Sequence, residues 1–170
     1  RSPVLLAYGE GFPAFLNGLD AAPSAEYLAD IARLEVARGH AWHAADAEPV
    51  AADRFAALTH EQLPRLQVLL HPSVTLLRSR FPVVSAWAAN QPGADAPIRC
   101  WKGEDAIIAR PRNEVTVARL PDGGFAFLSS LSNGATLATA IEAAIQDHAR
   151  FDLAANLAIL AGTGIVADLQ

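Results

Sequence analysis

Arginines near the middle of the chain have the types and spacing that point most directly to binding chemistry. Arg78 and Arg80 are two positions apart, so both guanidinium groups lie on the same side of a strand that includes them. Pro82 follows them and favours the start of a helix, whose first N–H groups attract anions. Together these features predict a site for a carboxylate or another anion. Pairing of the arginines with Glu35 or Asp30 inside the protein is an equally good interpretation.

The middle of the chain is basic and lies between two acidic flanks, which adds further basic residues to this candidate site. Residues 78–119 contain seven Lys or Arg and four Asp or Glu, whereas 1–61 and 120–170 contain more acids than bases. Such a segment could face an acidic peptide, an acidic subunit or phosphate, although arginines on the solvated faces of strands give the same pattern. Tryptophans are candidate interface anchors, but core packing is the ordinary role for at least two of the three. The residues predicted to bind a partner or a peptide are Arg78, Arg80, Trp87, Trp101, Arg110, Arg112 and Arg119.

A long helix predicted in the first third of the chain allows two further interpretations. His40 and His43 are three positions apart and Asp46 follows at the same spacing, so one face could offer three metal ligands. The surrounding residues lack the pattern of a known metal motif, and histidine near a helix end also interacts with exposed carbonyl groups. We therefore expect no metal in this chain. Glu35 and Arg38 lie near the apolar side of the same helix and predict a structural ion pair.

Catalytic signatures are absent from the sequence. There is no G-x-S-x-G elbow, no phosphate-binding loop, no H-E-x-x-H pair and no C-x-x-C pair. Cys100 is the single cysteine, so a disulfide framework is excluded, and no base in the sequence supports it as a nucleophile. We expect a protein without catalytic residues and without a cofactor of its own.

The composition is that of a folded globular protein. Of 170 residues, 52% are apolar and 18% are charged, and no run of 18 apolar residues could form a membrane span. The net charge of −5 argues against binding to duplex DNA, for which a basic surface is usual. No secretory signal is recognisable and the cysteine content fits a reducing compartment, so we expect a cytoplasmic protein. The chain has no methionine and begins at Arg1, which suggests a fragment of a longer protein.

Hydrophobic periodicity and turn residues predict an α+β protein in two parts. Residues 1–90 form a helical half, 91–97 a linker, and 98–170 a smaller, winged-helix-like half that contains an antiparallel β-hairpin and helices. Residues 125–131 fit either a strand or a helix. Helices are expected over 13–19, 24–45, 51–58, 60–66, 82–90, 135–147 and 152–161, and strands over 74–79, 105–111, 114–120 and 165–169.

Three stretches together resemble a bacterial family. They are RSPVLLAYGEGFPAFL at residues 1–16, YLADIARLEVARGHAWHAADAEP at 27–49 and LLHPSVTLLRSRFPVVSAW at 69–87. The family has no established function and carries the label of a DNA-binding domain. Its members are similar to the HvfC- and BufC-type partner subunits of multinuclear iron oxidases in ribosomal-peptide modification. The resemblance spans essentially the whole chain, but the family's usual N-terminal helical domain, to which the label chiefly belongs, does not precede these stretches.

The resemblance implies a non-catalytic partner subunit. Such a subunit docks on an iron-dependent oxidase, which holds the metal, and presents the leader region of a precursor peptide for modification. A peptide can be presented as an added edge strand. In this chain the candidate edge is the hairpin 105–120, which Arg110, Arg112 and Arg119 border.

Two other functions compete with this one. A DNA-binding regulator of the same family would gather its basic residues beside helix 152–161, but that helix has no positive charge, which argues against base recognition. An enzyme in its own right would need a pocket with convergent titratable groups. The sequence offers only Glu35, His40, His43 and His71 for such a pocket.

Overall fold

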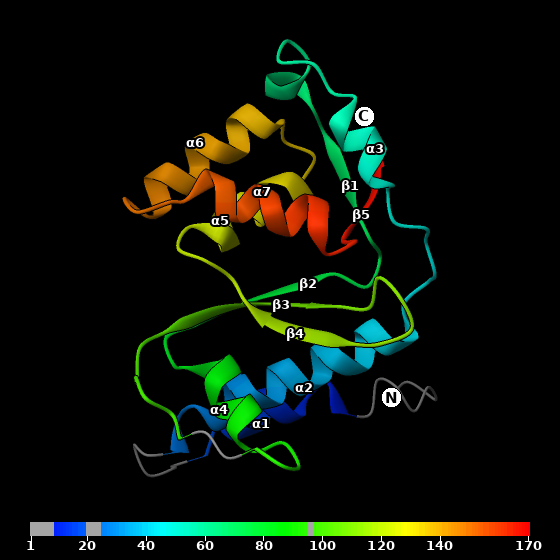
Figure 1. The fold of residues 1–170 in the computed structure, drawn as a ribbon. Coiled ribbons are helices and arrows are strands. Elements are labelled where there is room, and N and C mark those ends of the chain that lie inside the picture. The colour runs from blue at the N-terminus through cyan, green and yellow to red at the C-terminus, as the bar shows by residue number, and fades with distance from the viewer. Residues whose placement is uncertain (1–8, 20–24, 95–96) are drawn as a thin grey trace.

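The computed structural model describes residues 9–19, 25–94 and 97–170 and shows an α+β fold (Figure 1). In Figure 1, helices α5, α6 and α7 lie on one side of a three-stranded sheet, while α2 and α4 lie on the other side and α1 packs against α2. The helices are α1 (Phe12–Asn17), α2 (Leu28–His43), α3 (Ala52–Ala56), α4 (Val83–Ala89), α5 (Gly124–Ser132), α6 (Leu137–Asp147) and α7 (Leu153–Gly162), with a 3-10 turn, η3 (Leu63–Arg65).

The central sheet is antiparallel throughout and has the strand order β2–β3–β4. β2 (Thr75–Ser79) pairs with β3 (Glu104–Ala109), and β3 pairs with β4 (Thr116–Arg119). β3, the middle strand, follows the predicted linker 91–97 in the chain, whereas its neighbour β2 precedes that linker. Strand pairing thus crosses segment 91–97 and joins the two predicted parts of the chain.

A second sheet has two strands, which also come from opposite sides of segment 91–97 in the sequence. β1 (Val68–Leu70) pairs antiparallel with β5 (Val166–Leu169), next to the C-terminus. Its register shifts between Leu69 and Leu70, which marks a bulge or a similar irregularity. The peptide N–H of Val50 donates to the carbonyl oxygen of Val166 at 2.8 Å, so the chain after α2 also attaches to this sheet.

Two hydrophobic cores lie on the two faces of the central sheet because the side chains of a strand alternate. Ile107 of β3 points into the core that contains Phe127 of α5. The next residue, Ile108, points into the core that contains Leu34 of α2 and Val83 of α4. β3 therefore contributes residues to both cores, and each core contains residues from both predicted parts of the chain.

Most of the predicted elements are confirmed. The four expected strands appear as β2, β3, β4 and β5, and the helices expected over 82–90, 135–147 and 152–161 appear as α4, α6 and α7. Residues 125–131, which fitted two structures, are helical in α5, where Phe127, Leu128 and Leu131 are buried at helical spacing. Strand β1 was not expected, since its three residues are too few to show an alternation. The winged-helix likeness of the second half stays a prediction.

No helix in the described ranges has both the length and the apolar character that crossing a membrane requires.

The start of α5 packs closely against α7, and this contact predicts a stability effect. A Cβ at Gly124 would lie 2.7 Å from Oδ1 of Asn156 and 3.2 Å from Cβ of Leu120. Asn156 cannot move aside easily, because it is 1% exposed and its Nδ2 donates to the carbonyl oxygen of Asp152 at 2.8 Å. We expect Gly124→Ala to lower the free energy of unfolding by about 1–3 kcal/mol, as measured by urea denaturation.

Gly39 provides a matched control for this substitution. It lies inside α2, and a Cβ there would meet nothing within 4 Å. Gly39→Ala should therefore raise the free energy of unfolding by up to about 1 kcal/mol, because alanine favours the helix more than glycine does. Equal effects of the two substitutions would show that the contact between Gly124 and α7 is not tight.

Candidate functional site

The outer edge of β4 is the part of this fold best suited to bind an extended chain. β4 pairs only with β3 among the described residues, so its other side has no partner strand. Thr116, Ala118 and Arg119 are exposed and Val117 is half-buried. Figure 1 shows β4 along the outside of the sheet, next to α2. An unpaired strand edge is a template on which another chain can add a strand.

The register determines which backbone groups of β4 face outward. The N–H of Leu120 donates to the carbonyl oxygen of Asp105 at 2.8 Å, which continues the pairing of β4 with β3. In antiparallel pairs, hydrogen-bonded positions alternate with positions that face away from the partner. Ala118 therefore bonds to β3, whereas the N–H and C=O groups of Val117 and Arg119 point to the open side. These outward groups are what an added strand would bind.

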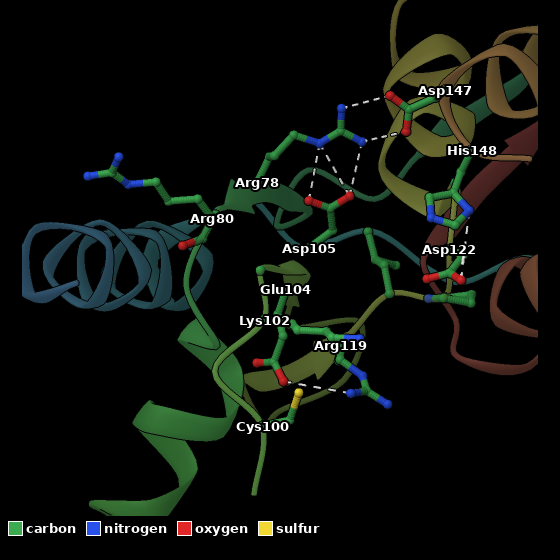
Figure 2. Close-up of a pocket in the computed structure, with 15 residues that line it drawn as sticks. Arg78, Arg80, Cys100, Lys102, Glu104, Asp105, Arg119, Asp122, Asp147 and His148 are labelled. Atoms are coloured by element: carbon green, nitrogen blue, oxygen red, sulfur yellow. Dashed lines mark hydrogen bonds and ion pairs between the residues drawn. The ribbon is translucent and has the colours of Figure 1, made fainter. Parts of the chain in front are cut away.

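Arg78 lies at one end of the sheet, between the carboxylates of Asp105 and Asp147 (Figure 2) and next to an aromatic ring. Its Nε and Nη2 donate to Asp105 at 3.0–3.3 Å, and its Nη1 and Nη2 donate to Asp147 at 2.9 and 2.7 Å. The guanidinium carbon lies 4.4 Å from the centre of the Phe125 ring. Arg78 thus links β2 and β3 to α5 and to the end of α6.

Arg78 pairs with acids inside the protein, but these acids are Asp105 and Asp147 and not the expected Glu35 or Asp30. Glu35 and Asp30, the predicted partners, belong to α2 on the opposite side of the sheet. Arg78 stands opposite Asp105 in the register, so both side chains point to the α5–α6 side. With five hydrogen bonds to carboxylates already made, Arg78 has little capacity left for an external anion.

The Arg78 guanidinium changes the acid–base behaviour of its partner. Its hydrogen bonds hold the pKa of Asp147 below the ordinary value of 3.8, against the opposing effect of burial. The hydrogen bonds that Arg78 donates to Asp147 and Asp105 in turn raise the pKa of Arg78. Because the pKa of Asp147 is lower in the folded state, the ionised carboxylate stabilises the fold above the unfolded-state pKa. That contribution is lost as the pH falls through the folded-state pKa.

Removal of this carboxylate should therefore cost stability in a pH-dependent way. We expect Asp147→Asn to lower the free energy of unfolding by about 1 kcal/mol near neutral pH, since the pair is partly exposed. The difference from wild type should shrink once the pH is below the folded-state pKa of Asp147, where the wild-type carboxylate is protonated too. Urea denaturation across this pH range tests it. Asp168→Asn is the control, because Asp168 lies 3.9 Å from Arg54 in an exposed pair. A difference that does not change with pH would contradict the assignment.

Arg110 caps the C-terminal end of α2. Its Nε donates to the carbonyl oxygen of Ala41 at 3.0 Å, and its Nη2 donates to that of Ala44 at 2.8 Å and to Asp46 at 2.9 Å. These bonds satisfy carbonyl groups that a helix end leaves free, and the positive charge suits the helix dipole. The side chain is 11% exposed, so Arg110 does not border a binding edge as the sequence suggested.

A buried polar network holds the backbone beside this cap. The Oγ of Ser73 accepts the N–H of Arg110 at 2.7 Å and lies 2.8 Å from Nδ1 of His71. Nε2 of His71 lies 3.1 Å from the carbonyl oxygen of Ala47. A carbonyl oxygen only accepts, so Nε2 carries the proton and Nδ1 accepts from Ser73. His71 is 3% exposed and both of its ring nitrogens contact protein groups, so it holds this part of the backbone in place.

The capping role of Arg110 can be separated from a surface role by its effect on stability. We expect Arg110→Ala to lower the free energy of unfolding by about 2 kcal/mol, because the last carbonyl groups of α2 lose their donors. Arg112→Ala is the matched control, since Arg112 is exposed in the turn after β3 and should change stability by less than about 0.5 kcal/mol. Denaturation followed by circular dichroism measures both. Similar losses would show that the cap does not stabilise α2.

The remaining arginines of the predicted site do not converge. Arg80 lies beyond the last residue of β2, so strand alternation does not align it with Arg78, and Figure 2 shows the two side chains pointing in different directions. Nη2 of Arg80 contacts Glu26 at 2.6 Å. Arg119 lies on β4 with 68% of its side chain exposed. Of the predicted basic residues, Arg112 and Arg119 therefore remain beside the open edge.

The predicted ion pair between Glu35 and Arg38 is present, with 2.7 Å between Oε2 and Nη1. Trp87 joins it, because its Nε1 donates to Oε1 of Glu35 at 2.7 Å and the Arg38 guanidinium lies 5.0 Å from its ring centre. Trp87 is thus tied to α2 inside the fold. Trp42 and Trp101 are each 60% exposed, although core packing was the ordinary expectation for at least two of the three tryptophans.

The histidines of α2 and Asp46 do not form a metal site. Nε2 of His40 lies 3.3 Å from Oε1 of Glu10, and Asp46 binds Arg110. Over residues 9–19, 25–94 and 97–170, no three His, Cys, Asp or Glu side chains are grouped as metal ligands would be.

Glu104 is a residue of the site that sequence reasoning missed. It is 8% exposed, and its carboxylate accepts the N–H of Ser85 at 2.9 Å and the Oγ–H of Ser85 at 2.6 Å. It therefore caps the start of α4. Asp105 and Asp147, the partners of Arg78, were missed for the same reason. Nothing local in a sequence marks an acid whose partner is distant along the chain.

Comparison with protein-family models and with curated proteins gives no match for this chain. The resemblance to partner subunits of iron oxidases therefore stays a prediction.

Proposed function

We propose that this chain is a non-catalytic partner subunit that binds a precursor peptide along β4 and presents it to an iron-dependent oxidase. The observation that carries the peptide-binding part is the open edge of β4, with the backbone groups of Val117 and Arg119 directed outward. The oxidase as the docking partner is supported by the resemblance of residues 1–16, 27–49 and 69–87 to partner subunits of such enzymes.

The edge suits a peptide for two physical reasons. Main-chain hydrogen bonds to an edge strand supply affinity for any extended segment, and side chains next to the edge supply selectivity. β4 itself is short, with four residues, so it offers only a few such bonds. A bound peptide must therefore obtain much of its affinity from side chains beside the edge, which suits recognition of a defined leader segment.

DNA binding has less support from the geometry. Arg78 and Arg110 are engaged by acidic groups and carbonyl oxygens inside the protein. Helix α7 has no basic residue, and in Figure 1 it lies in the helical layer on the other side of the sheet from α2. The basic residues that stay exposed therefore do not surround a helix that could enter a groove.

Peptide binding is tested with a phage-displayed library of random ten-residue peptides, selected on the immobilised chain. We expect selected peptides to bind Val117→Pro at least about five-fold more weakly, because proline removes an outward N–H and leaves the bonds to β3 in place. Ala118→Val is the control, since it changes a side chain of β4 and keeps every outward N–H of the strand. Thermal unfolding verifies that both variants fold. Equal affinity for wild type and Val117→Pro would place the peptide elsewhere.

The oxidase partner is tested with the chain as bait in a lysate of its own source, with metal analysis of the retained proteins. An iron-loaded protein of enzyme size is the expected result. Retention of nucleic acid that survives moderate salt, without an iron protein, would overturn the proposal in favour of a DNA-binding regulator.

A further inference from the structure

We propose that the peptide on β4 runs antiparallel to it and carries an acidic residue opposite Arg119 and a large apolar residue four positions later, beside Trp42. This inference rests on the proposed function and specifies the class of peptide that the edge selects. It follows from the different chemistry at the two ends of β4.

The side chains that select the peptide lie on one face of the sheet. Val115 and Val117 pack against the core beneath α2 and α4, and alternation places Arg119 on the same face. Peptide residues opposite these three positions direct their side chains to that face as well, about 5 Å from their cross-strand neighbours. Positions opposite Arg119 and Val115 are four residues apart in the peptide.

The end of β4 near Arg119 attracts an acid. Arg119 forms a long ion pair with the buried Glu104, with 3.7 Å between Nη1 and Oε1, but no hydrogen bond joins the two side chains. Oε1 of Glu104 accepts the hydroxyl of Ser85 at 2.6 Å, and within the described ranges the Arg119 guanidinium makes no hydrogen bond, so its N–H donors remain available to a peptide carboxylate. Arg119 and Lys102 both line a hollow of about 640 Å³ (Figure 2). Within the described ranges Lys102 makes no ion pair.

Other acids around this hollow have their own partners. Asp105 and Asp147 bind Arg78 on the opposite face of the sheet. Asp122 lies 3.3 Å from Nη2 of Arg150, on the α5–α6 side. Asp105 and Asp147 thus share Arg78, and Asp122 has Arg150, so each of these acids has a cationic partner other than Arg119.

The other end of β4 favours an apolar residue and disfavours an acid. Trp42 is 60% exposed and lines a hollow of about 560 Å³ with Gly39, Val115 and the turn after β3. Glu114 lines the same hollow, as do Glu35 and its ion-pair partner Arg38, so an acidic peptide residue would meet the like charge of Glu114 there. An aromatic wall with acids at its rim selects a large uncharged side chain.

The strand direction gives the motif its order. All pairs in the central sheet are antiparallel, and antiparallel pairs are slightly more stable per residue than parallel ones. In an antiparallel added strand, the residue opposite Arg119 comes first and the residue opposite Val115 comes four positions later. The motif is therefore acidic, three intervening residues, apolar.

The test uses two labelled ten-residue peptides in the same threonine-rich background. One has Asp at position three and Leu at position seven, and the other has these two residues exchanged. By fluorescence anisotropy we expect the first peptide to bind at least about three-fold more tightly. Arg119→Glu should remove this preference, and a peptide with Lys at position three should bind this variant more tightly than the Asp peptide does. Arg65→Glu, with the same charge change at an exposed residue of η3 that lines neither hollow, should leave the preference intact.

The outcomes separate this inference from the proposal beneath it. Equal binding of both peptides to wild type, weakened by Val117→Pro and unchanged by Arg119→Glu, would overturn the motif and leave edge binding in place. Tighter binding of the exchanged peptide would indicate a parallel strand and overturn the antiparallel order. Absence of binding by either peptide, together with no peptides selected from the random library, would overturn the proposed function as well.

Discussion

The pairing of β2 with β3 is the constraint on which the rest of this structure depends. The two strands come from opposite sides of segment 91–97, and their ladder joins the parts of the chain that precede and follow it. Because the residues of a strand alternate between faces, Ile107 and Ile108 of β3 enter the two different cores. A slip of one residue in this register would turn each side chain of the slipped strand toward the opposite core, where it would not fit its neighbours.

Polar contacts at the end of the same ladder attach the helical layers. Arg78 and Asp105 point to one face, where Arg78 binds both Asp105 and Asp147, the latter at the end of α6. The next residue, Ser79, points to the other face, where its hydroxyl donates to Asp30 of α2 at 2.6 Å. Asp30 is 7% exposed, so its buried charge needs polar partners. Ser79 is one of them and Arg33 is another. Two successive residues of β2, Arg78 and Ser79, therefore connect the sheet to the helices on both of its faces.

These internal contacts reduce the basic surface available to a partner. Of the central arginines, Arg78 and Arg110 satisfy groups of the protein itself, while Arg112 and Arg119 stay exposed near the outer strand. The interaction surface is accordingly narrower than the basic middle segment, and it centres on β4. A short edge strand that ends in a charged residue resists indiscriminate pairing. Selective pairing with a peptide that complements Arg119 is compatible with that protection.

The sequence by itself determined the α+β class, the positions of most helices and strands, and the ion pair between Glu35 and Arg38. All of these depend on residues close together in the chain, through hydrophobic period, turn residues or helical spacing. The tertiary structure alone decided which acids bind Arg78, since Asp105 and Asp147 are 27 and 69 positions away. It also decided that Arg110 caps α2 from a distance of 69 positions and that β4 lies at the edge of its sheet. Such contacts arise from strand order and register, which local periodicity does not encode.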